Sequence, residues 1–311
     1  MFESTNRVQH APWRAASRTA GDVDEHAAHL SGWHQEYDQL GAGRFDGRLD
    51  EALADGVQLF RERTSQRLRQ RCQVWAGALW CGITEADDGS RLNGRRVAAA
   101  GVMVSGHDGS FELVSPPGHA IVGIVVARDL LARRAPALAL PDARDAAWWP
   151  VDAVQRQHAL ALARAILALA AAGQAPPPGA LLDTVVALLA ARSVPRERGN
   201  AVSRRQLVAQ AHALVAGAPE RVPGIAELCA ALHVSRRTLQ YAFEDEAGIS
   251  PLAFLRSVRL NGVRRLLRAG RGGQTVQAAA QAWGFWNLSA FAADYRRQFG
   301  ERPSETLARA G

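Results

Sequence analysis

The stretches Ser235–Pro251 (SRRTLQYAFEDEAGISP) and Asn287–Pro303 (NLSAFAADYRRQFGERP) share one pattern, and they begin 52 residues apart. In each, a Ser or Asn precedes two large apolar residues four positions apart, and a Gly and a Pro follow them. Ser and Asn accept hydrogen bonds from the free N–H groups at a helix start, whereas Gly adopts the left-handed conformation that ends a helix. Each stretch therefore predicts one short helix with a defined start and end, whose apolar pair faces a core.

An apolar helix is also predicted before each copy, over residues 225–232 (IAELCAAL) and 276–283 (VQAAAQAW). Only two residues separate the first pair of helices, and only three separate the second. Two helices joined by so short a turn form a helix-turn-helix, and its second helix commonly enters the major groove of DNA. The sequence thus predicts two helix-turn-helix units in tandem.

The segment between the two units, residues 251–269 (PLAFLRSVRLNGVRRLLRA), carries an apolar stripe at helical spacing. Arg264, Arg265 and Arg268 lie in its last turns, where positive charge suits the negative end of the helix dipole. At a rise of 1.5 Å per residue such a helix measures about 28 Å, close to the roughly 34 Å of one DNA turn. We therefore expect one long helix that holds the two units over successive major grooves.

The net positive charge is confined to the part of the chain that carries the repeat. Residues 201–311 contain 15 Arg and 8 acidic residues, whereas residues 1–200 contain 22 Arg and 22 acidic residues. A localised basic excess is typical of proteins that bind the phosphate backbone of nucleic acids.

The upstream part of the chain has a different pattern of apolar and turn-forming residues. From residue 45 to about 126, short apolar runs alternate with Gly, Asp, Ser and Pro, which predicts a β-rich sandwich or barrel. Two helices are predicted after it, over residues 159–172 and 181–191. We therefore predict an α+β protein with four parts: a loose N-terminal segment (1–22), a β-rich, cupin-like effector-binding and dimerisation domain that ends in two helices (23–192), a linker (193–202), and an all-α domain with two helix-turn-helix motifs (203–311).

The residues of the tail also carry a resemblance to a known family. SRRTLQYAFEDEAGISP, RLNGVRRLL and WGFWNLSAFAADYRRQFGERPSETL resemble, in order and spacing, the DNA-binding domain of the AraC/XylS family of transcription regulators. The upstream stretch GRFDGRLDEALADGVQLFRERTSQRLRQ resembles more weakly the effector-binding and dimerising domain of some members. The resemblance implies a homodimeric, effector-controlled regulator that binds double-stranded DNA, with RNA polymerase as a further partner.

A narrower resemblance concerns the effector. HVSRRTLQ together with WGFWNLSAFAADY is most similar to regulators of the ethanolamine-utilisation type. This resemblance makes ethanolamine and adenosylcobalamin the candidate effectors, and no bound cofactor is predicted.

The predicted DNA contacts of the first unit lie on the helix faces away from Leu239 and Phe243. The resemblance places Arg237, Gln240 and Tyr241 at base contacts, because Arg suits guanine, Gln suits adenine, and Tyr reaches a phosphate or a thymine methyl. The alternative is an ordinary solvated helix face.

The second unit offers poorer chemistry for reading bases. Its predicted base contacts are Leu288, Ser289 and Ala292, and Ala293 stands where family members often have Arg or another polar residue. We therefore expect the first unit to specify sequence and the second mainly to anchor, with Trp286 lying either against the DNA backbone or packed in the turn. The predicted phosphate contacts of both units are Ser235, Arg236, Thr238, Trp286, Asn287, Arg296 and Arg297.

The two helices before residue 192 are more apolar than one small domain needs. We therefore predict that Leu160, Ile166 and Leu169 line a dimer interface.

The sequence also argues against several other classes of protein. The start MFESTNRVQHAPWR lacks the apolar core of a secretory signal, and no apolar run reaches the roughly 20 residues of a membrane span, so we expect a cytoplasmic protein. Cys72, Cys81 and Cys229 are odd in number and show no Cys-x-x-Cys spacing, so we predict neither a disulfide nor a zinc site.

No metal or catalytic residue is predicted, and we expect the protein not to be an enzyme. His26, His29 and His34 lie near Glu25 and Glu36, but the His-x-His pair with a following Glu that cupin metal sites use is absent. Two alternatives remain open: a cupin-type metal-dependent enzyme fused to a DNA-binding tail, and a DNA binder without an effector.

Overall fold

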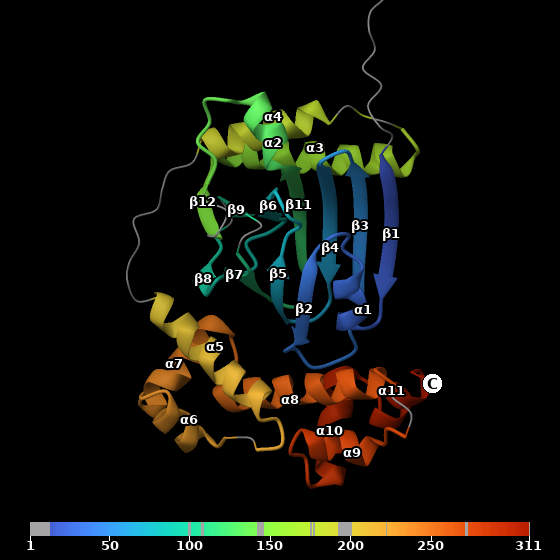
Figure 1. Ribbon diagram of the computed structural model, residues 1–311, viewed down its shortest axis with the longest axis vertical. Coiled ribbons are helices and arrows are strands. Elements are labelled where there is room, and N and C mark those ends of the chain that lie inside the picture. The colour runs from blue at the N-terminus through green and yellow to red at the C-terminus, as the bar shows by residue number, and fades with distance from the viewer. Residues whose placement is uncertain are drawn as a thin grey trace, which may run out of the picture.

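The computed structural model of the protein describes residues 13–98, 101–106, 109–141, 146–174, 176, 178–191, 201–221, 223–270 and 273–310. The chain forms an N-terminal half of two β-sheets with helices, followed by an all-helical C-terminal half that lies below the sheets in Figure 1. Residues 193–200 of the predicted linker lie outside the described residues, and α5 (Ala201–Gly217) already includes the last two residues of that predicted linker, 201 and 202.

The β-rich prediction is confirmed, and both sheets are antiparallel along every described strand pair. The seven-stranded sheet has the order β1 (Arg14–Ala20), β3 (Gly47–Ala54), β4 (Val57–Thr64), β11 (His119–Ala127), β6 (Ala78–Thr84), β9 (Gly101–Gly106) and β12 (Ala147–Pro150). The five-stranded sheet has the order β2 (His34–Gln39), β5 (Leu68–Gln73), β10 (Phe111–Ser115), β7 (Arg91–Leu92) and β8 (Arg95–Arg96).

Strand β1 corrects the prediction that residues 1–22 are loose. Residues 14–20 pair with β3 in a continuous antiparallel register from Arg14 to Ala20, and only residues 1–12 of this segment lie outside the described residues. The sequence RAASRTA gives no apolar alternation because β1 is an edge strand and most of its side chains are exposed or half-buried.

The N-terminal half has two cores because successive side chains of a strand point to opposite faces of a sheet. Aromatic residues fill the space between the two sheets, where Trp80 stacks on Phe111 with ring centroids 4.5 Å apart. The short helix α1 (Val23–Ala28) also packs onto this core. The opposite face of the large sheet packs against α2 (Arg128–Arg134), α3 (Ala153–Ala171) and α4 (Gly179–Ala190), which confirms the two predicted helices and forms the upper layer in Figure 1.

This packing overturns most of the predicted dimer interface. Leu160 and Ile166 are only 1% and 3% exposed, because they pack against the sheet of their own chain. The prediction is wrong for both residues, since the apolar stripe of α3 covers a sheet face that is itself apolar. Leu169 is 37% exposed and remains available to a partner.

The C-terminal half contains α5, α6 (Ile225–Ala231), α7 (Arg236–Glu246), α8 (Pro251–Arg268), α9 (Val276–Ala282), α10 (Leu288–Phe299) and α11 (Pro303–Ala308). These helices form two small cores, and α8 contributes to both: Phe254 packs with the first unit and Val263 with the second. The long connecting helix is therefore confirmed. Among the described residues, no helix has both the length and the apolar character needed to cross a membrane.

The start and stop signals of the two units work as predicted. The Ser235 hydroxyl accepts a hydrogen bond from the Thr238 amide, and the Asn287 side chain accepts one from the Ala290 amide, each at 3.0 Å. Gly248 and Gly300 follow α7 and α10 with φ values of +67° and +71°, which is the left-handed region that favours glycine. Both helix-turn-helix predictions are confirmed.

Candidate nucleic-acid interface

The predicted base-reading side chains of the first unit lie on the surface of α7. Tyr241 is 52% exposed, and Arg236 and Arg237 are also exposed. Arg237 donates a hydrogen bond to the Tyr241 hydroxyl at 2.9 Å, with its guanidinium carbon 5.2 Å from the centre of the Tyr241 ring. The side chains of α7 thus present an ordered cationic and aromatic surface.

Two other predicted contacts of the first unit already have partners within the helix. Gln240 donates to a Glu244 carboxylate oxygen at 2.5 Å, so reading a base through this amide requires that hydrogen bond to break. The Ser235 hydroxyl caps α7 and lies 2.8 Å from the Thr238 hydroxyl. Ser235 therefore acts first as a helix cap.

The turns of the two units use different residues for the same left-handed position. His233, between α6 and α7, has φ of +52°, whereas Gly284 takes this conformation between α9 and α10 with φ of +70°. A side chain in this region costs free energy that glycine avoids. The first turn is therefore the more strained of the two.

The predicted residues of the second unit are also exposed. Leu288 is 38% exposed and Trp286 is 72% exposed, so the alternative in which Trp286 packs within the turn is wrong. Arg297 forms an ion pair with Asp294, whereas no described residue pairs with the exposed Arg296. The other predicted contacts of this unit, Asn287, Ser289, Ala292 and the neighbouring Ala293, are exposed as well.

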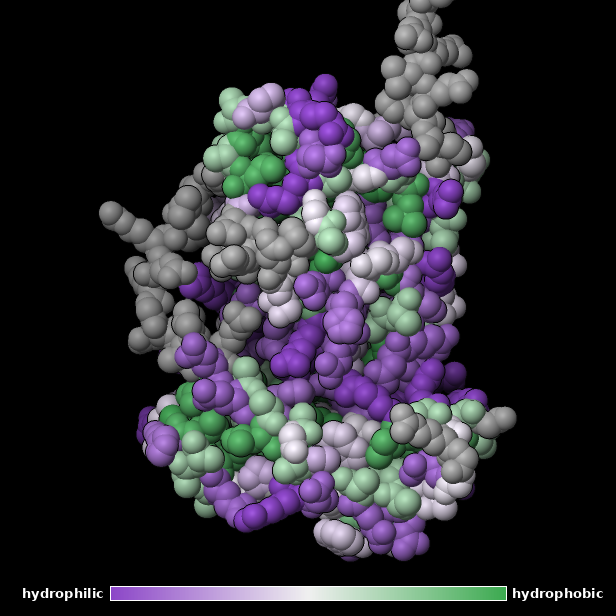
Figure 2. Space-filling model, in the orientation of Figure 1, coloured by the Kyte–Doolittle hydropathy of each residue, from purple (hydrophilic) through white to green (hydrophobic). Residues whose placement is uncertain are grey.

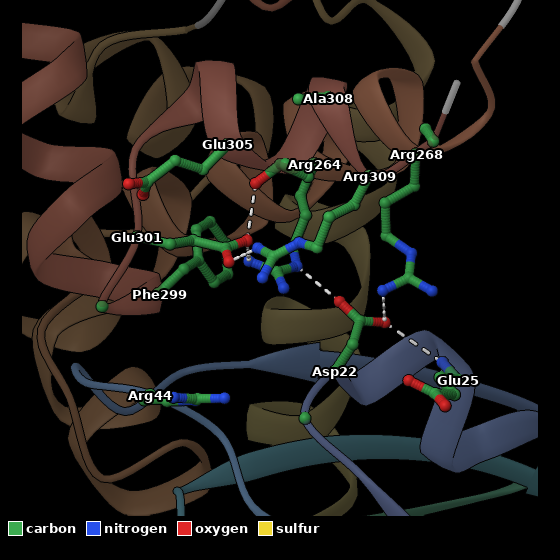
Figure 3. A pocket seen from close by; sticks show the side chains of 14 residues that line it. Asp22, Glu25, Arg44, Arg264, Arg268, Phe299, Glu301, Glu305, Ala308 and Arg309 are labelled. Atoms are coloured by element: carbon green, nitrogen blue, oxygen red, sulfur yellow. Dashed lines mark hydrogen bonds and ion pairs between the residues drawn. The ribbon is translucent and has the colours of Figure 1, made fainter.

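The arginines of α8 have a role that the sequence did not predict. Arg264 lies 2.5 Å from Asp22, and Arg268 lies 2.9 Å from the other oxygen of the same carboxylate (Figure 3). Arg265 forms ion pairs with Asp24 at 3.2 Å and with Asp38 at 2.7 Å. These arginines therefore join the helical half to the N-terminal half, in addition to any effect on the helix dipole.

Asp38 is the most enclosed acid of this junction. Burial alone would raise the pKa of Asp38, but the hydrogen bond from His212 and the charges of Arg265 and Arg69 outweigh burial and hold that pKa well below its ordinary value. His212 belongs to α5 and lies 3.4 Å from Asp38. Helices α5 and α8 therefore both contact this one carboxylate.

A cleft of about 800 Å³ opens beside these ion pairs, between α1, α8 and α11. Figure 3 shows Asp22 between Arg264 and Arg268 in this cleft, with Glu301 on the other side of Arg264. Arg44 reaches the cleft from the N-terminal half. Figure 2 shows hydrophilic residues along the junction of the two halves, as expected for an interface held by charges.

The end of α7 also contacts the N-terminal half. Asp245 forms ion pairs with Arg91 of β7 at 3.5 Å and with Arg204 of α5 at 2.7 Å. Glu246 is 3% exposed and lies against Gly94, where an added Cβ would overlap its carboxylate. Burial raises the pKa of Glu246 to about 7, and Asp245 and Glu112 add to the rise.

Two of the three histidines considered as metal ligands lie near each other, since the ring centroids of His26 and His29 are 6.1 Å apart. His26 is buried, with its Nε2 3.0 Å from Glu62, and the Tyr37 hydroxyl donates to the same carboxylate oxygen at 3.0 Å. Within the described part of the chain, no group of three or more His, Cys, Asp or Glu side chains forms a candidate metal site. Cys72, Cys81 and Cys229 are free thiols.

A family model and curated relatives match the C-terminal part of the chain. A family model described as a helix-turn-helix domain matches residues 228–309. The chain is 40% identical over 82 residues to the regulatory protein HrpB of Ralstonia nicotianae, covering 26% of this chain and 17% of that protein. It is 38% identical over 77 residues to the XylDLEGF operon transcriptional activator 1 of Pseudomonas putida, covering 24% of this chain and 23% of the activator.

One solved structure is matched by this chain over nearly the whole length of that structure. The chain is 43% identical to a probable AraC family transcriptional regulator from Rhodopseudomonas palustris, covering 34% of this chain and 97% of that one, with a TM-score of 0.32. The chain spans less than a quarter of the length of the two curated relatives above. The tandem units of the C-terminal half therefore form a helix-turn-helix domain of AraC type, matched over residues 228–309.

Proposed function

We propose that the protein is a transcription regulator that binds double-stranded DNA sequence-specifically through α7 and α10. The observation that carries this proposal is the pair of capped helices in a family-matched domain, both of which present the predicted contact residues to solvent. The basic excess of residues 201–311 supports it further.

We assign different roles to the two recognition helices. Arg237, Gln240 and Tyr241 supply hydrogen-bonding and aromatic groups for base edges, whereas α10 offers mainly methyl groups there. The first unit then specifies sequence, and the second anchors through Arg296 and its neighbours.

The N-terminal half is proposed as a cupin-like effector and dimerisation domain of a cytoplasmic regulator. Its acids form direct ion pairs with α8. A small molecule bound in the N-terminal half would therefore alter DNA affinity through these contacts with the connecting helix. Ethanolamine, alone or with adenosylcobalamin, is the first candidate effector by sequence resemblance. RNA polymerase is the further partner that the family implies, and Leu169 is the remaining candidate for a homodimer contact.

Selection from a random DNA pool tests DNA binding by the full-length protein. We expect one enriched sequence that competes against random duplex by a factor of about 10³ or more. Enrichment of no sequence, with equal affinity for all duplexes, would contradict sequence-specific regulation and favour an effector-independent DNA binder.

Two further measurements test the role of the N-terminal half. Thermal unfolding of the full chain with ethanolamine, with and without adenosylcobalamin, should show stabilisation in at least one condition if this effector is right. Metal analysis of the purified protein addresses the enzyme alternative, because stoichiometric iron, zinc or manganese would favour it.

A further inference from the structure

Arg259 joins the connecting helix to the turn of the second helix-turn-helix unit. It lies in the middle of α8, and its Nε donates a hydrogen bond to the Trp283 carbonyl at 2.9 Å. Its Nη2 donates to the Gly284 carbonyl at 2.6 Å, and its guanidinium carbon lies 4.0 Å from the centre of the Phe285 ring. One side chain therefore contacts three consecutive residues of the turn between α9 and α10.

These contacts use features that only arginine combines. The guanidinium is planar and donates several hydrogen bonds in a fixed fork, and its flat face stacks on an aromatic ring. The two carbonyls follow the last turn of α9, where helix carbonyls lack partners and positive charge is favoured. Burial lowers the pKa of Arg259 to about 10, with a further contribution from Arg256, so the side chain remains charged at neutral pH.

The backbone of α8 holds the same turn from a second point. Gly262 lies one helical turn beyond Arg259, and an added Cβ there would overlap the Trp283 ring. On the far side of the turn, the Phe285 ring packs against Phe291 of α10 with centroids 5.1 Å apart. The turn that leads directly into α10 is therefore fixed to α8 on one side and to α10 on the other.

The first unit is fixed to the same helix. Phe254 of α8 packs edge-on against Phe243 of α7, with ring centroids 5.0 Å apart. Both units are thus attached to α8, so each attachment contributes to the angle between α7 and α10. The two units repeat at a spacing of 52 residues, and the position 52 residues before Arg259 is the partly buried Leu207. The contact of an arginine with the turn is therefore a feature of the second unit.

We infer that Arg259 is a positioning residue for DNA recognition, which sets the spacing between the DNA segments that the two units contact. It touches the turn rather than DNA, and it acts through the orientation of α10. This inference rests on the proposed DNA binding. A domain with this turn loosened should still recognise each segment, but it should tolerate more than one distance between them.

The experiment compares operators that differ only in that distance. The operator selected by the full-length protein is lengthened or shortened by one and two base pairs between its two protected segments, and affinities are measured for wild type, Arg259→Ala and Arg259→Lys. For wild type we expect a loss of about tenfold or more for each base pair, as for a misplaced contact. For Arg259→Ala, the loss of affinity for each added or removed base pair should be only about threefold, and the affinity for the operator of original length should fall.

Arg256→Ala is the matched control, because it removes an equal charge from the same helix. Arg256 is about half exposed, and it contacts α10 through a single ion pair with the half-buried Asp294 at 3.5 Å, whereas Arg259 holds the turn through two hydrogen bonds and a ring contact. The spacing profile of Arg256→Ala should match that of wild type. A hydroxyl-radical footprint provides a second readout: Arg259→Ala should keep protection by the first unit and lose part of the protection by the second.

The outcomes separate this inference from the function on which it rests. An Arg259→Ala protein with the wild-type spacing profile would overturn the positioning role. If Arg259→Ala does not fold, Arg259→Lys decides, because lysine keeps the charge on a single nitrogen but lacks the planar fork that contacts both carbonyls and the Phe285 ring. A folded lysine variant with an unchanged profile would also overturn the positioning role. Failure of the wild-type protein to select any operator would instead contradict the proposed function.

Discussion

Gln39 and Gln298 exchange hydrogen bonds across the junction between the two halves of the chain. The Gln298 side chain donates to the Gln39 carbonyl at 2.7 Å, and the Gln39 side chain donates to the Gln298 carbonyl at 2.6 Å. Asn261 of α8 adds two more hydrogen bonds to the backbone of Gln39, at 2.9 and 3.1 Å. The N-terminal half therefore contacts α10, one of the two helices proposed to read DNA, without any intermediate element.

The first prediction concerns this junction. Gln39→Ala removes the side chain that donates to the carbonyls of Gly41, Gly43 and Gln298, and a lost hydrogen bond costs about 0.5–1.5 kcal/mol. We expect faster hydrogen–deuterium exchange in α10 and in the loop that follows β2. Gln66→Ala is the control, because it removes only one exposed hydrogen bond to Arg44, and it should leave exchange in α10 unchanged. Equal exchange in both variants would show that the junction does not depend on this pair.

The second prediction concerns base reading by α7. Arg237→Ala and Gln240→Ala should each cost about 1–3 kcal/mol on the selected operator and much less on random duplex, because base contacts carry the sequence preference. Glu244→Ala frees the Gln240 amide and should not weaken operator binding. Competition assays measure all three variants. Equal losses on operator and random DNA for Arg237→Ala and Gln240→Ala would place the reading face elsewhere.

The third prediction concerns phosphate contact by α10. Arg296→Ala should weaken binding to every sequence and lower the salt dependence of affinity by about one unit, because one phosphate contact and its released counterion are lost. Arg297→Ala should have a smaller effect, since Arg297 is already paired with Asp294. Salt titrations of both variants provide the measurement. An unchanged slope for Arg296→Ala would remove it from the phosphate contacts.

The fourth prediction concerns pH. Glu246 has a pKa of about 7 in the folded chain against an ordinary value of 4.5, so the folded chain keeps a proton that the unfolded chain loses between these values. The stability that depends on this proton is therefore fully present below about pH 4.5 and is lost as the pH rises through about 7. Glu246→Gln stays neutral, so it should gain stability relative to wild type across this range and hold a constant advantage above it.

Urea unfolding between pH 5 and pH 8 tests the role of Glu246. Glu220→Gln alters an exposed carboxylate and should follow the wild-type profile. Parallel pH profiles for wild type and Glu246→Gln would show that this carboxylate does not titrate differently in the folded chain.

The fifth prediction concerns the first turn. His233 adopts φ of +52°, and this conformation costs a residue with a side chain about 1–2 kcal/mol, which glycine avoids. Because glycine also loses more backbone entropy on folding, we expect His233→Gly to stabilise the chain by at most about 1 kcal/mol. His233→Ala should not stabilise it. Thermal unfolding of both variants checks this, and a destabilised glycine variant would point to a contact of the imidazole that outweighs the strain.

The local features of the helical half could be predicted from sequence because their signals lie within a few residues. The caps Ser235 and Asn287 and the glycines that end α7 and α10 each specify a conformation by their own chemistry. The exposure of the predicted DNA contacts followed from the position of the apolar pairs on each helix.

Features that depend on distant pairing could not be predicted in this way. Arg264 meets Asp22 across 242 positions of sequence, and nothing near either residue indicates its partner. Leu160 and Ile166 show why an apolar stripe is ambiguous: the pattern fixes which helix face is buried but not whether a sheet or a second chain covers it. Edge strand β1 escaped detection because an edge strand needs little apolar surface.

The dependence of Arg264, Arg265 and Arg268 on acids of the other half limits how this chain can be re-engineered. A chimaera that joins its DNA-binding half to an unrelated sensor would separate these guanidinium groups from Asp22, Asp24 and Asp38. Arg264 would keep its ion pair with Glu301, but Arg265 and Arg268 would lose these partners and would then attract polyanions in the cell, which raises affinity for bulk DNA at the expense of selectivity. A successful graft must therefore carry matching carboxylates, so the sensor of such a chimaera is to be chosen by its charge as well as by its ligand.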